Sequence, residues 1–591
     1  MNNKENEYEE IEGIGIVKAS EFTEKKSGRF DMVPAEGIAG NYIDVCEDEN
    51  GLLRDIRFRN EDKFNFAFDV VDALAKKCPN KTAMYHISRE GKERNITFRD
   101  MMNYSNKTAN YLQYLGVRKG DRVLLILKRH YQFWFSILAL HKIGAIAVPC
   151  SYLLTKKDFE YRLKAGSISA VICTADGEVT DEMDKALSNY KGLKTKVIVG
   201  GSKTGWENYN RDIRFFATQF RRTANTACGN DPMLMFFTSG TTSYPKMATH
   251  SYKYALGHYI TAKYWHQVDP DGLHFTISDT GWGKALWGKL YGQWLAEAPV
   301  FTYDYDEFFA KEILSMIEKH KITSFCAPPT VYRMLVHVDM SKFDLSSLKN
   351  VTTAGEALNP EIFYKFKEAT GLSIMEGFGQ TETTLTIASL KGMTPRPGSM
   401  GKASPMYDIR VMRPDQTECT VGETGEIVIN LKAGIPNGLF LGYYMDKEKT
   451  DSVWHDDFYH TGDTAYIDKE GYLWYVGRVD DIIKSAGYRV GPFEIENEIM
   501  RLPYVLECAV TSVPDKIRGQ AIKASVVLID GVTETDKLKK EMMKYLKNNM
   551  ASYKRPKIID FVTDLPKTSS GKVRRSEIKA KDWKEDDKKK D

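Results

Sequence analysis

The order of apolar and polar positions predicts alternating helices and strands in the first third of the chain. In DKFNFAFDVVDALAKK (residues 62–77), Phe64, Phe68, Val71 and Ala75 recur at the spacing of one helical face. Further along are three short, continuous runs rich in β-branched residues: VLLIL (123–127), AVIC (170–173) and KVIVG (196–200). Runs of this kind are typical of parallel strands buried on both faces, so we expect an α/β sheet.

The longest apolar stretch, FWFSILALHKIGAIAV (133–148), is interrupted by His141 and Lys142. The uninterrupted parts are too short to cross a bilayer and predict a buried helix followed by a strand. A second set of strand-like runs includes SFCAPP (324–329) and NVTTAGEA (350–357), and Gly-rich turns crowd residues 421–491.

The last part of the chain predicts a smaller unit with both strands and helices. ECAVTSVPD (507–515) and AIKASVVLI (521–529) have the composition of strands, and TDKLKKEMMKYLKNNM (535–550) has an amphipathic helical pattern. The final KAKDWKEDDKKKD (579–591) is so rich in charge that we expect a solvated tail.

Length, charge and cysteine content bear on which kinds of protein this chain can be. A length of 591 residues predicts several domains, and a net charge of +3 does not favour nucleic acid as a partner. The start, MNNKENEYEEIEG, lacks the features of a signal or transit peptide, so we expect a cytoplasmic protein without stable membrane insertion. Eight cysteines without a CxxC pair suggest neither a zinc site nor a disulfide framework, and we expect them reduced and mostly buried.

The strongest local signal for chemistry is FFTSGTTSYPK (236–246), in which hydroxyl residues and a glycine follow an apolar strand and a lysine closes the loop. Gly240 allows close approach of the backbone to a ligand, and the hydroxyls and Lys246 can surround triphosphate oxygens. The spacing does not fit a Walker A loop. Taken alone, the segment could also be a Ser/Thr-rich surface turn.

Three further segments carry candidate chemistry: EGFGQTETT (376–384), FYHTGDTAYIDKEGYLWYVGRVDDIIKSAGYRVGPFEIENEI (458–499) and LPKTSSGKVRR (565–575). Each has an ordinary alternative. The TGD and GYLWYVGR pieces could be turns of a meander, FEIENEI the charged face of a helix, and SSGK a flexible turn.

Together, in this order and spacing, the four segments resemble the adenylate-forming (AMP-binding) superfamily of acyl-CoA synthetases, luciferases and peptide-synthetase adenylation domains. The resemblance covers residues 60 to 580. Within it, SDTGWGKALWGKLYGQW (278–294), FCAPPTVYRML (325–335) and GYRVGPFEIE (487–496) resemble the medium-chain acyl-CoA synthetases. The family's loop usually has glycine at the position of Ser243, so we expect a slightly altered loop here.

The resemblance implies a site for ATP or AMP and three catalytic residues. Thr381 corresponds to the residue that contacts the α-phosphate, Glu382 to the Mg²⁺ carboxylate, and Lys572 to the lysine that reaches both the carboxylate substrate and the α-phosphate. Asp463 corresponds to the ribose-hydroxyl acceptor and Arg478 to a donor to ribose and phosphate. The other implied ATP-site residues are Thr238, Ser239, Gly240, Thr241, Thr242, Ser243, Lys246, Gly355, Glu356, Ala357, Glu376, Gly377, Phe378, Gly379 and Gln380.

The resemblance also implies sites for coenzyme A and for the acyl chain. Gly379 lies where acetate-specific relatives have a tryptophan that closes the acyl pocket, so a deeper pocket is implied, with Trp282 and Trp287 as an aromatic wall. Ordinary core packing is the alternative for both tryptophans, and a solvated basic turn is the alternative for Arg555 and Lys557. The implied CoA-site residues are Ser485, Ala486, Gly487, Tyr488, Arg489, Arg518, Arg555 and Lys557.

The expected architecture is an N-terminal domain of residues 1–479, with α/β sheets and a small β-barrel, and a small mobile α+β C-terminal domain of residues 480–591. Asp480 is the implied hinge. The implied activity is AMP-forming ligation of a medium-chain or branched carboxylic acid to CoA, with ATP and Mg²⁺, in a monomer or homodimer. The alternatives are an aryl-CoA ligase of the benzoate type, an enzyme that loads a carrier protein, and a non-catalytic nucleotide-binding regulator.

Overall fold

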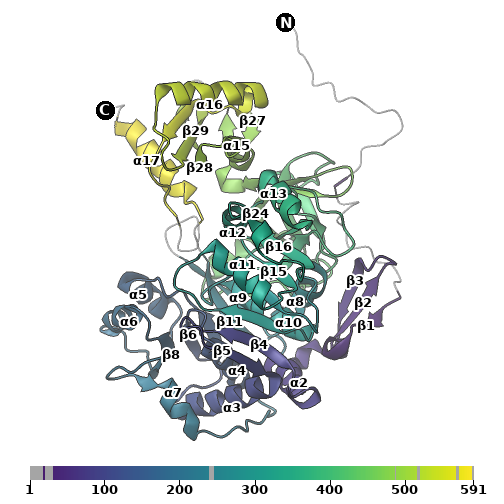
Figure 1. The fold of residues 1–591 in the computed structure, drawn as a ribbon, viewed down its shortest axis with the longest axis vertical. Helices are drawn as coiled ribbons and strands as arrows, with labels where there is room; N and C mark the ends of the chain where they lie inside the picture. Colours follow the sequence, from purple (N-terminus) through teal and green to yellow (C-terminus); the bar gives the residue numbers. More distant parts are fainter. Residues whose placement is uncertain are drawn as a thin grey trace.

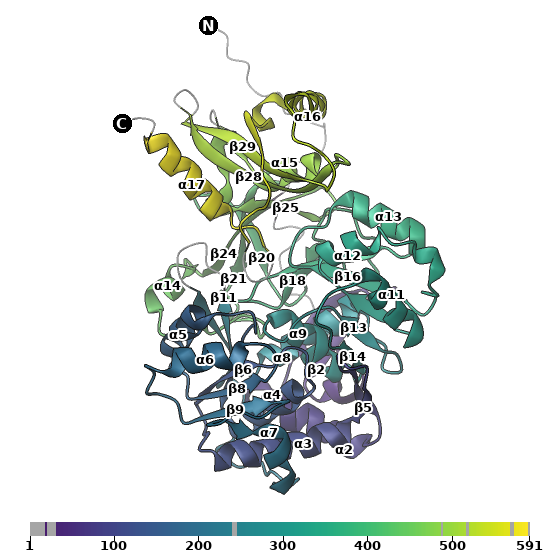
Figure 2. The same ribbon diagram turned by 60° about the vertical axis from the view of Figure 1, so that its left-hand side comes forward.

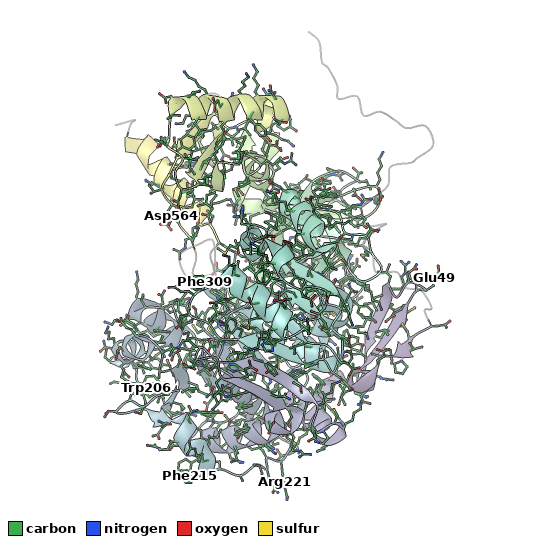
Figure 3. The ribbon with its side chains drawn as sticks, viewed as in Figure 1. Glu49, Trp206, Phe215, Arg221, Phe309 and Asp564 are labelled. Atoms are coloured by element: carbon green, nitrogen blue, oxygen red, sulfur yellow. The ribbon has the colours of Figure 1, made fainter. Side chains whose placement is uncertain are left out.

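The computed structural model describes residues 18–19, 31–238, 245–485, 488–515, 519–567 and 572–588. Two large mixed sheets with their helices form the body of the molecule, and a smaller domain lies at one end of its long axis (Figures 1 and 2). Side chains fill the space between these elements (Figure 3). The predicted α/β class with a large N-terminal part and a small C-terminal part is confirmed.

The first large sheet has eight strands, and the three β-branched runs lie in its parallel part. They form β6, β8 and β9, each with a continuous apolar core, so these strand predictions are confirmed. The apolar stretch after β6 forms the fully buried helix α4 (Gln132–Ile143) and then strand β7, also as predicted. The strand order is β10 (Glu207–Asn208), β9 (Thr195–Val199), β8 (Ala170–Thr174), β6 (Arg122–Ile126), β7 (Ile146–Pro149), β11 (Pro232–Thr238), β12 (Lys246–Ser251) and β22 (Gly442–Tyr443).

The second large sheet has nine strands, with the central six parallel. The order is β19 (Lys402–Ala403), β18 (Leu385–Ala388), β17 (Ile374–Gly379), β16 (Asn350–Ala354), β15 (Ser324–Cys326), β13 (His274–Thr276), β14 (Val300–Tyr303), β4 (Thr82–Ile87) and β5 (Glu93–Thr97). The helix predicted over residues 62–77 begins only at Ala67, as the π-helical η3 (Ala67–Asp72) followed by α2 (Ala73–Lys77).

Much of the Gly-rich region belongs to a five-stranded sheet of β20 (Ile409–Met412), which precedes the region, β21 (Gly425–Asn430), β23 (Trp454–His455), β24 (Phe458–Ile467) and β25 (Leu473–Arg478). The C-terminal domain has a sheet of β26 (Ile483–Ser485), β27 (Tyr488–Val490), β28 (Val505–Asp515), β29 (Gly519–Leu528) and β30 (Ile558–Phe561), with helices α15 (Pro492–Ile499), α16 (Asp536–Asn549) and α17 (Arg575–Lys588). Both strands and the helix predicted there are confirmed.

The predicted solvent exposure of residues 579–591 is confirmed where burial is described, since Ala580, Lys581 and Trp583 are exposed and Lys579 and Asp582 are partly buried. The segment is, however, part of helix α17 and not an irregular tail. The Trp583 indole donates a hydrogen bond to the Ser512 carbonyl of β28 (3.1 Å), and Asp582 forms an ion pair with Lys523 of β29 (2.7 Å).

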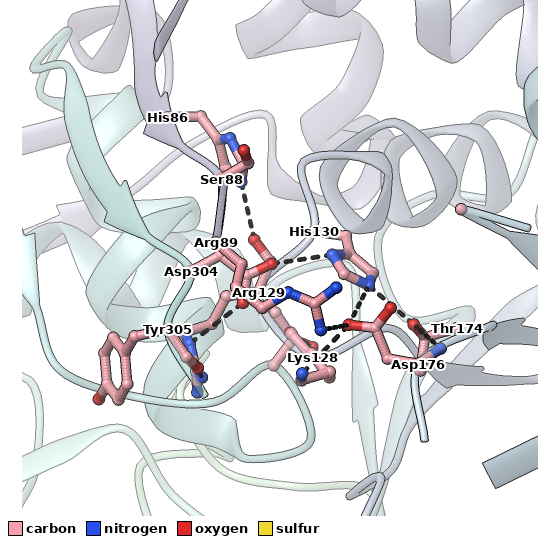
Figure 4. Close-up of polar contacts among 12 residues, drawn as sticks. His86, Ser88, Arg89, Lys128, Arg129, His130, Thr174, Asp176, Asp304 and Tyr305 are labelled. Atoms are coloured by element: carbon pink, nitrogen blue, oxygen red, sulfur yellow. Dashed lines mark hydrogen bonds and ion pairs between the residues drawn. The ribbon is translucent and has the colours of Figure 1, made fainter. Parts of the chain in front are cut away.

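A cluster of charged side chains joins the two large sheets where their parallel strands end (Figure 4). From the first sheet, Lys128 pairs with Asp306 (2.9 Å), and His130 Nδ1 lies 2.9 Å from Asp304, which follows β14 of the second sheet. Arg129 lies between Asp304 and Asp279, at 3.6 Å and 3.3 Å. Arg129, Lys128 and Asp304 are buried, so their charges stabilise one another in the junction.

The charge of Lys142, in the apolar helix α4, is buried together with its hydrogen-bond acceptors. Its side chain is completely buried, and Nζ donates to Asp72 (2.7 Å), Ser105 Oγ (2.9 Å) and Asn106 Oδ1 (2.6 Å). Three acceptors satisfy the three protons of the ammonium group.

All eight cysteines are free; five are buried and three are partly buried, as predicted. In the described ranges, no helix combines the length and apolar character needed to cross a bilayer.

We expect Lys142→Met to lower the free energy of unfolding by about 3–5 kcal/mol, because it leaves the Asp72 carboxylate buried without its cation. Chemical denaturation measures the effect. The double variant Lys142→Met with Asp72→Asn should recover part of the loss, and a single variant as stable as the parent would contradict the role of this pair.

Candidate active site

The predicted site segments follow the last residues of parallel strands. The hydroxyl-rich loop follows β11, the AGEA turn follows β16, and the QTE turn follows β17. Residues Ser239, Gly240, Thr241, Thr242 and Ser243 of the loop lie outside the described residues, but Thr238 ends β11 and Lys246 begins the antiparallel β12 directly opposite it. Both ends of the predicted phosphate loop are therefore fixed in one sheet.

The QTE turn is held by the neighbouring sheet elements. The amide of Gln380 donates to the Thr461 carbonyl (2.8 Å) and to the Asp463 carboxylate. The carboxylate of Glu382 accepts a hydrogen bond from the Tyr443 hydroxyl (2.8 Å). Burial raises the pKa of Glu382, although Tyr443, Arg478 and Lys246 act in the opposite direction.

Asp463 and Arg478, the predicted ribose contacts, face each other across strands β24 and β25. They form an ion pair of 2.9 Å, and the Tyr475 hydroxyl donates to the other oxygen of Asp463 (3.1 Å). Burial raises the pKa of Asp463, while Arg478 lowers it. Gly462 has φ +68°, which favours glycine, and a Cβ there would lie 2.7 Å from the Arg478 guanidinium, so a larger residue would have to shift Arg478.

The AGEA turn exposes the residues predicted to line the adenine base. Gly355 and Glu356 are exposed and Ala357 is partly buried. Gly355 has φ +107°, a conformation that favours glycine. The Ala354 carbonyl just before it accepts a hydrogen bond from Lys284 Nζ (2.8 Å).

Glu376, a predicted ATP-site residue, binds the main chain of two neighbouring loops. Its buried carboxylate accepts hydrogen bonds from the backbone N–H groups of Leu358 (3.0 Å) and Gly398 (3.1 Å). Burial raises the pKa of this carboxyl to about 8. Glu376 therefore connects the AGEA turn to β17, and its contact with ATP stays a prediction.

A side chain at position 379 would point at the main chain of a neighbouring turn. A Cβ at this position would lie 2.3 Å from the Thr384 carbonyl oxygen, so a larger residue must displace the turn that carries Thr381 and Glu382. Gly377 is similarly restricted, because its Cβ would lie 2.7 Å from the indole of Trp265. Phe378 packs against Tyr475, with ring centroids 6.2 Å apart.

An aromatic group lies near helix α9 (Gly283–Lys289), where the acyl wall was predicted. Trp287 is partly buried beside Trp265 (5.8 Å between centroids) and His266 (5.7 Å), and Trp282 precedes the helix. Lys284, one turn from Trp287, places Nζ 5.7 Å from its ring. Lys284 was not among the predicted site residues, although a lysine between Trp282 and Trp287 is a recognisable signal.

Lys572 belongs to the C-terminal domain and is exposed. Burial lowers the pKa of Lys284, and the positive charge of Lys572 lowers it further. Three residues along, Arg575 forms a bidentate pair with Glu496 of α15 (2.6 and 2.9 Å) and fixes the start of α17.

The predicted CoA residues are only partly described. Ala486, Gly487 and Arg518 lie outside the described residues. Ser485, Tyr488 and Arg489 belong to the β26–β27 hairpin, of which the backbone pairing is described. Arg555 donates to the Met550 carbonyl (2.9 Å), and Lys557 is exposed. Asp480 lies in the single turn η7 (Val479–Asp481) between β25 and β26, where the chain passes from one domain to the other.

Comparison with known proteins gives consistent matches across the chain. Residues 71–444 match the family model described as "AMP-binding enzyme", and residues 494–572 match "AMP-binding enzyme C-terminal domain". The chain is 38% identical over 543 residues to human acyl-coenzyme A synthetase ACSM3, mitochondrial, covering 90% of this chain and 92% of that protein.

Two solved structures illustrate the similarity of this fold to known CoA ligases. The anthranilate CoA ligase AuaEII in complex with anthranoyl-AMP has a TM-score of 0.80 and 30% identity, covering 88% of this chain and 97% of that one. A benzoate CoA ligase from Burkholderia xenovorans has a TM-score of 0.76 and 25% identity, covering 87% and 100%.

We expect Gly379→Ala to lower kcat/KM for short and long acids alike, by about 10- to 100-fold, because its Cβ displaces the catalytic turn. A panel of acids from acetate to decanoate measures this. Gly371→Ala is a control for steric displacement, since a Cβ there has open space around it; its positive φ adds a backbone strain that Gly379 does not have. A selective gain for acetate would instead favour the predicted role of position 379 as the floor of the acyl pocket.

Proposed function

Because the chain belongs to the AMP-binding enzyme family, we propose that it is an AMP-forming acyl-CoA synthetase acting on a medium-chain or branched carboxylic acid. The observation that carries the proposal is the convergence of Glu382, Asp463 and Arg478: Arg478 forms an ion pair with Asp463 (2.9 Å), and its charge also lowers the pKa of Glu382. Identity to acyl-coenzyme A synthetases over most of the chain supports the same activity.

The first half-reaction brings together two anions, a carboxylate and the α-phosphate of ATP. Positive groups must offset this repulsion, and Lys246, Arg478 and Lys572 are the candidates. No general base is required, since the acid is already ionised at neutral pH. The carboxylate oxygen attacks phosphorus, the bond to the bridging oxygen breaks, and pyrophosphate leaves with that oxygen.

Glu382 fits the role of a Mg²⁺ ligand, because a carboxylate oxygen is a hard donor and substrate phosphates supply the rest of such a coordination sphere. Among the described residues, no group of three or more His, Cys, Asp or Glu side chains is arranged to hold a metal by itself. A bound ion would offset phosphate charge in the transition state. The protein's own part is to fix the Glu382 carboxylate through Tyr443.

The second half-reaction transfers the acyl group from AMP to the thiol of CoA. The hairpin of β26 and β27 belongs to the C-terminal domain, as does Lys572, and one face of so small a domain cannot present both to the same site at once. A rotation about Asp480 between the two steps resolves the conflict.

An aryl acid is the second candidate substrate class. The aromatic group of Trp287, Trp265 and His266 and the similarity to an anthranilate CoA ligase favour it. The acid panel should therefore include benzoate and anthranilate beside hexanoate, octanoate and 2-methylbutyrate. The expected cytoplasmic location and the monomeric or dimeric state stay predictions, and the human relative is named as a mitochondrial protein.

Turnover should depend on ATP, a divalent cation and CoA, and should release AMP and pyrophosphate in equal amounts. Chromatography of the nucleotides with a coupled pyrophosphate assay measures this. Without CoA, only a single burst of pyrophosphate is expected. Formation of ADP and phosphate would exclude the proposed reaction.

The two half-reactions should be separable by substitutions in the C-terminal domain. Lys572→Ala should slow pyrophosphate release by about 100-fold or more, because it removes a charge that acts on the transition state. The same variant should still convert synthetic acyl-adenylate and CoA to thioester. Gly487→Leu should show the opposite pattern if the predicted pantetheine tunnel passes this residue. Equal losses in both steps for both variants would argue against domain alternation.

A further inference from the structure

The last two strands of the eight-stranded sheet, β12 and the edge strand β22, carry residues that contact the Thr381–Glu382 turn. Strands β12 and β22 pair antiparallel, with Ala248 opposite Tyr443. The segment leading into β22 also contacts the turn, because the backbone N–H of Phe440 donates to the Glu382 carbonyl (2.8 Å). The segment that leads into β22 is thus bound to the main chain of the turn.

Tyr443 connects two residues of the site. Its hydroxyl donates to Glu382 Oε1 at 2.8 Å, and its ring lies 5.3 Å from Nζ of Lys246, at the end of the predicted phosphate loop. The ring itself is packed against Phe440, with centroids 5.0 Å apart, and is 8% exposed. A buried ring of this kind has little rotational freedom, so its hydroxyl fixes one oxygen of the Glu382 carboxylate and leaves the other for a cation.

His250, on the adjacent strand, holds the other residue of the turn. Its Nε2 lies 2.7 Å from the Thr381 carbonyl oxygen, and a carbonyl only accepts, so Nε2 is the donor. The side chain is completely buried, and burial lowers its pKa to about 4. The neutral ring therefore carries its proton on Nε2, and among the described residues its Nδ1 has no hydrogen-bond partner.

We propose that Tyr443 and His250 are positioning residues for adenylate formation: Tyr443 orients the Glu382 carboxylate toward the metal, and His250 fixes the Thr381 main chain beside the α-phosphate. This proposal rests on the proposed function, in which Glu382 binds the metal and Thr381 contacts the phosphate. It adds residues outside the recognised motifs, from strands that reach the turn only in the folded chain.

The substitution Tyr443→Phe tests the first part, because phenylalanine keeps the ring contacts with Phe440 and Lys246 and removes only the hydroxyl. Electron paramagnetic resonance of Mn²⁺ in the presence of enzyme and ATP, without acid, gives the fraction of metal bound. We expect the Kd for Mn²⁺ to rise about 10-fold. The matched control is Tyr252→Phe, which also loses a hydroxyl from a buried ring, but one that donates to the His141 carbonyl (2.9 Å).

Glu382→Gln separates failure of this inference from failure of the proposed function. If Glu382→Gln weakens Mn²⁺ binding and Tyr443→Phe does not, Tyr443 does not orient the carboxylate. If Glu382→Gln binds Mn²⁺ as the parent does, the metal role of Glu382 itself is wrong. Weaker Mn²⁺ binding by Tyr443→Phe, together with unchanged Mn²⁺ binding by Tyr252→Phe, supports the inference.

For His250, the comparison is between leucine and glutamine at the same position. Glutamine can place an N–H donor near the site of Nε2, whereas leucine has none. We expect His250→Leu to slow pyrophosphate release at saturating ATP by about 10-fold or more, and His250→Gln to recover most of that rate. If the two variants have the same rate and the same thermal midpoint, the hydrogen bond to Thr381 is without effect. Rescue by glutamine supports it.

Discussion

The geometry of the candidate site depends on the ion cluster that joins the two large sheets. Arg129, from the end of β6, lies between Asp279 and Asp304, and the second of these follows a strand of the other sheet. Buried charges stabilise a structure only when each is paired, so the cluster specifies one relative position of the sheets. The same contact fixes the loop that begins α9, because the Thr280 N–H donates to the Lys128 carbonyl (3.3 Å). Lys284 and Trp287 take their positions from that loop.

Polar contacts with the main chain have a similar function throughout the site. Glu376 binds two backbone N–H groups, Gln380 binds the Thr461 carbonyl, and Lys284 binds the Ala354 carbonyl. Each contact joins segments that belong to different elements of the fold. The rigidity of the site therefore comes from bonds between these segments, made by side chains that need not touch a substrate, and this agrees with the preorganisation that electrostatic catalysis requires.

The sequence predicted the parts of the structure that have a local signal. Continuous β-branched runs identified β6, β8 and β9, and an apolar stretch identified α4, because burial of parallel strands and of a core helix leaves a plain pattern. The motif order indicated the family, but it could not separate residues that face a ligand from those that support the turns. Glu376 and Gly379 show this, since their environments come from Leu358, Gly398 and Thr384, which approach only in the folded chain.

Sequence patterns also did not predict helix α17 or the positions of His250 and Tyr443, because both depend on contacts between distant parts of the chain. The charged composition of residues 579–591 did not predict helix α17, in which the Trp583 indole donates a hydrogen bond to β28. His250 and Tyr443 lie far apart in the chain and belong to no recognised motif, yet strand pairing brings them to the same turn. Periodicity describes which face of an element is buried, and it does not identify the distant element against which that face packs.

The burial of the cysteines has a chemical consequence for a protein that makes thioesters. An acyl-adenylate reacts with thiolates, and the protein carries eight thiols of its own. Burial raises the pKa of Cys150 to about 11 and of Cys419 to about 12, and it also raises the pKa of Cys326, the cysteine whose charge is felt by Lys284. At neutral pH these three thiols stay protonated and out of contact with solvent. Burial therefore disfavours their acylation and leaves the thiol of coenzyme A as the better acceptor, whereas Cys46, Cys78 and Cys228 are only partly buried.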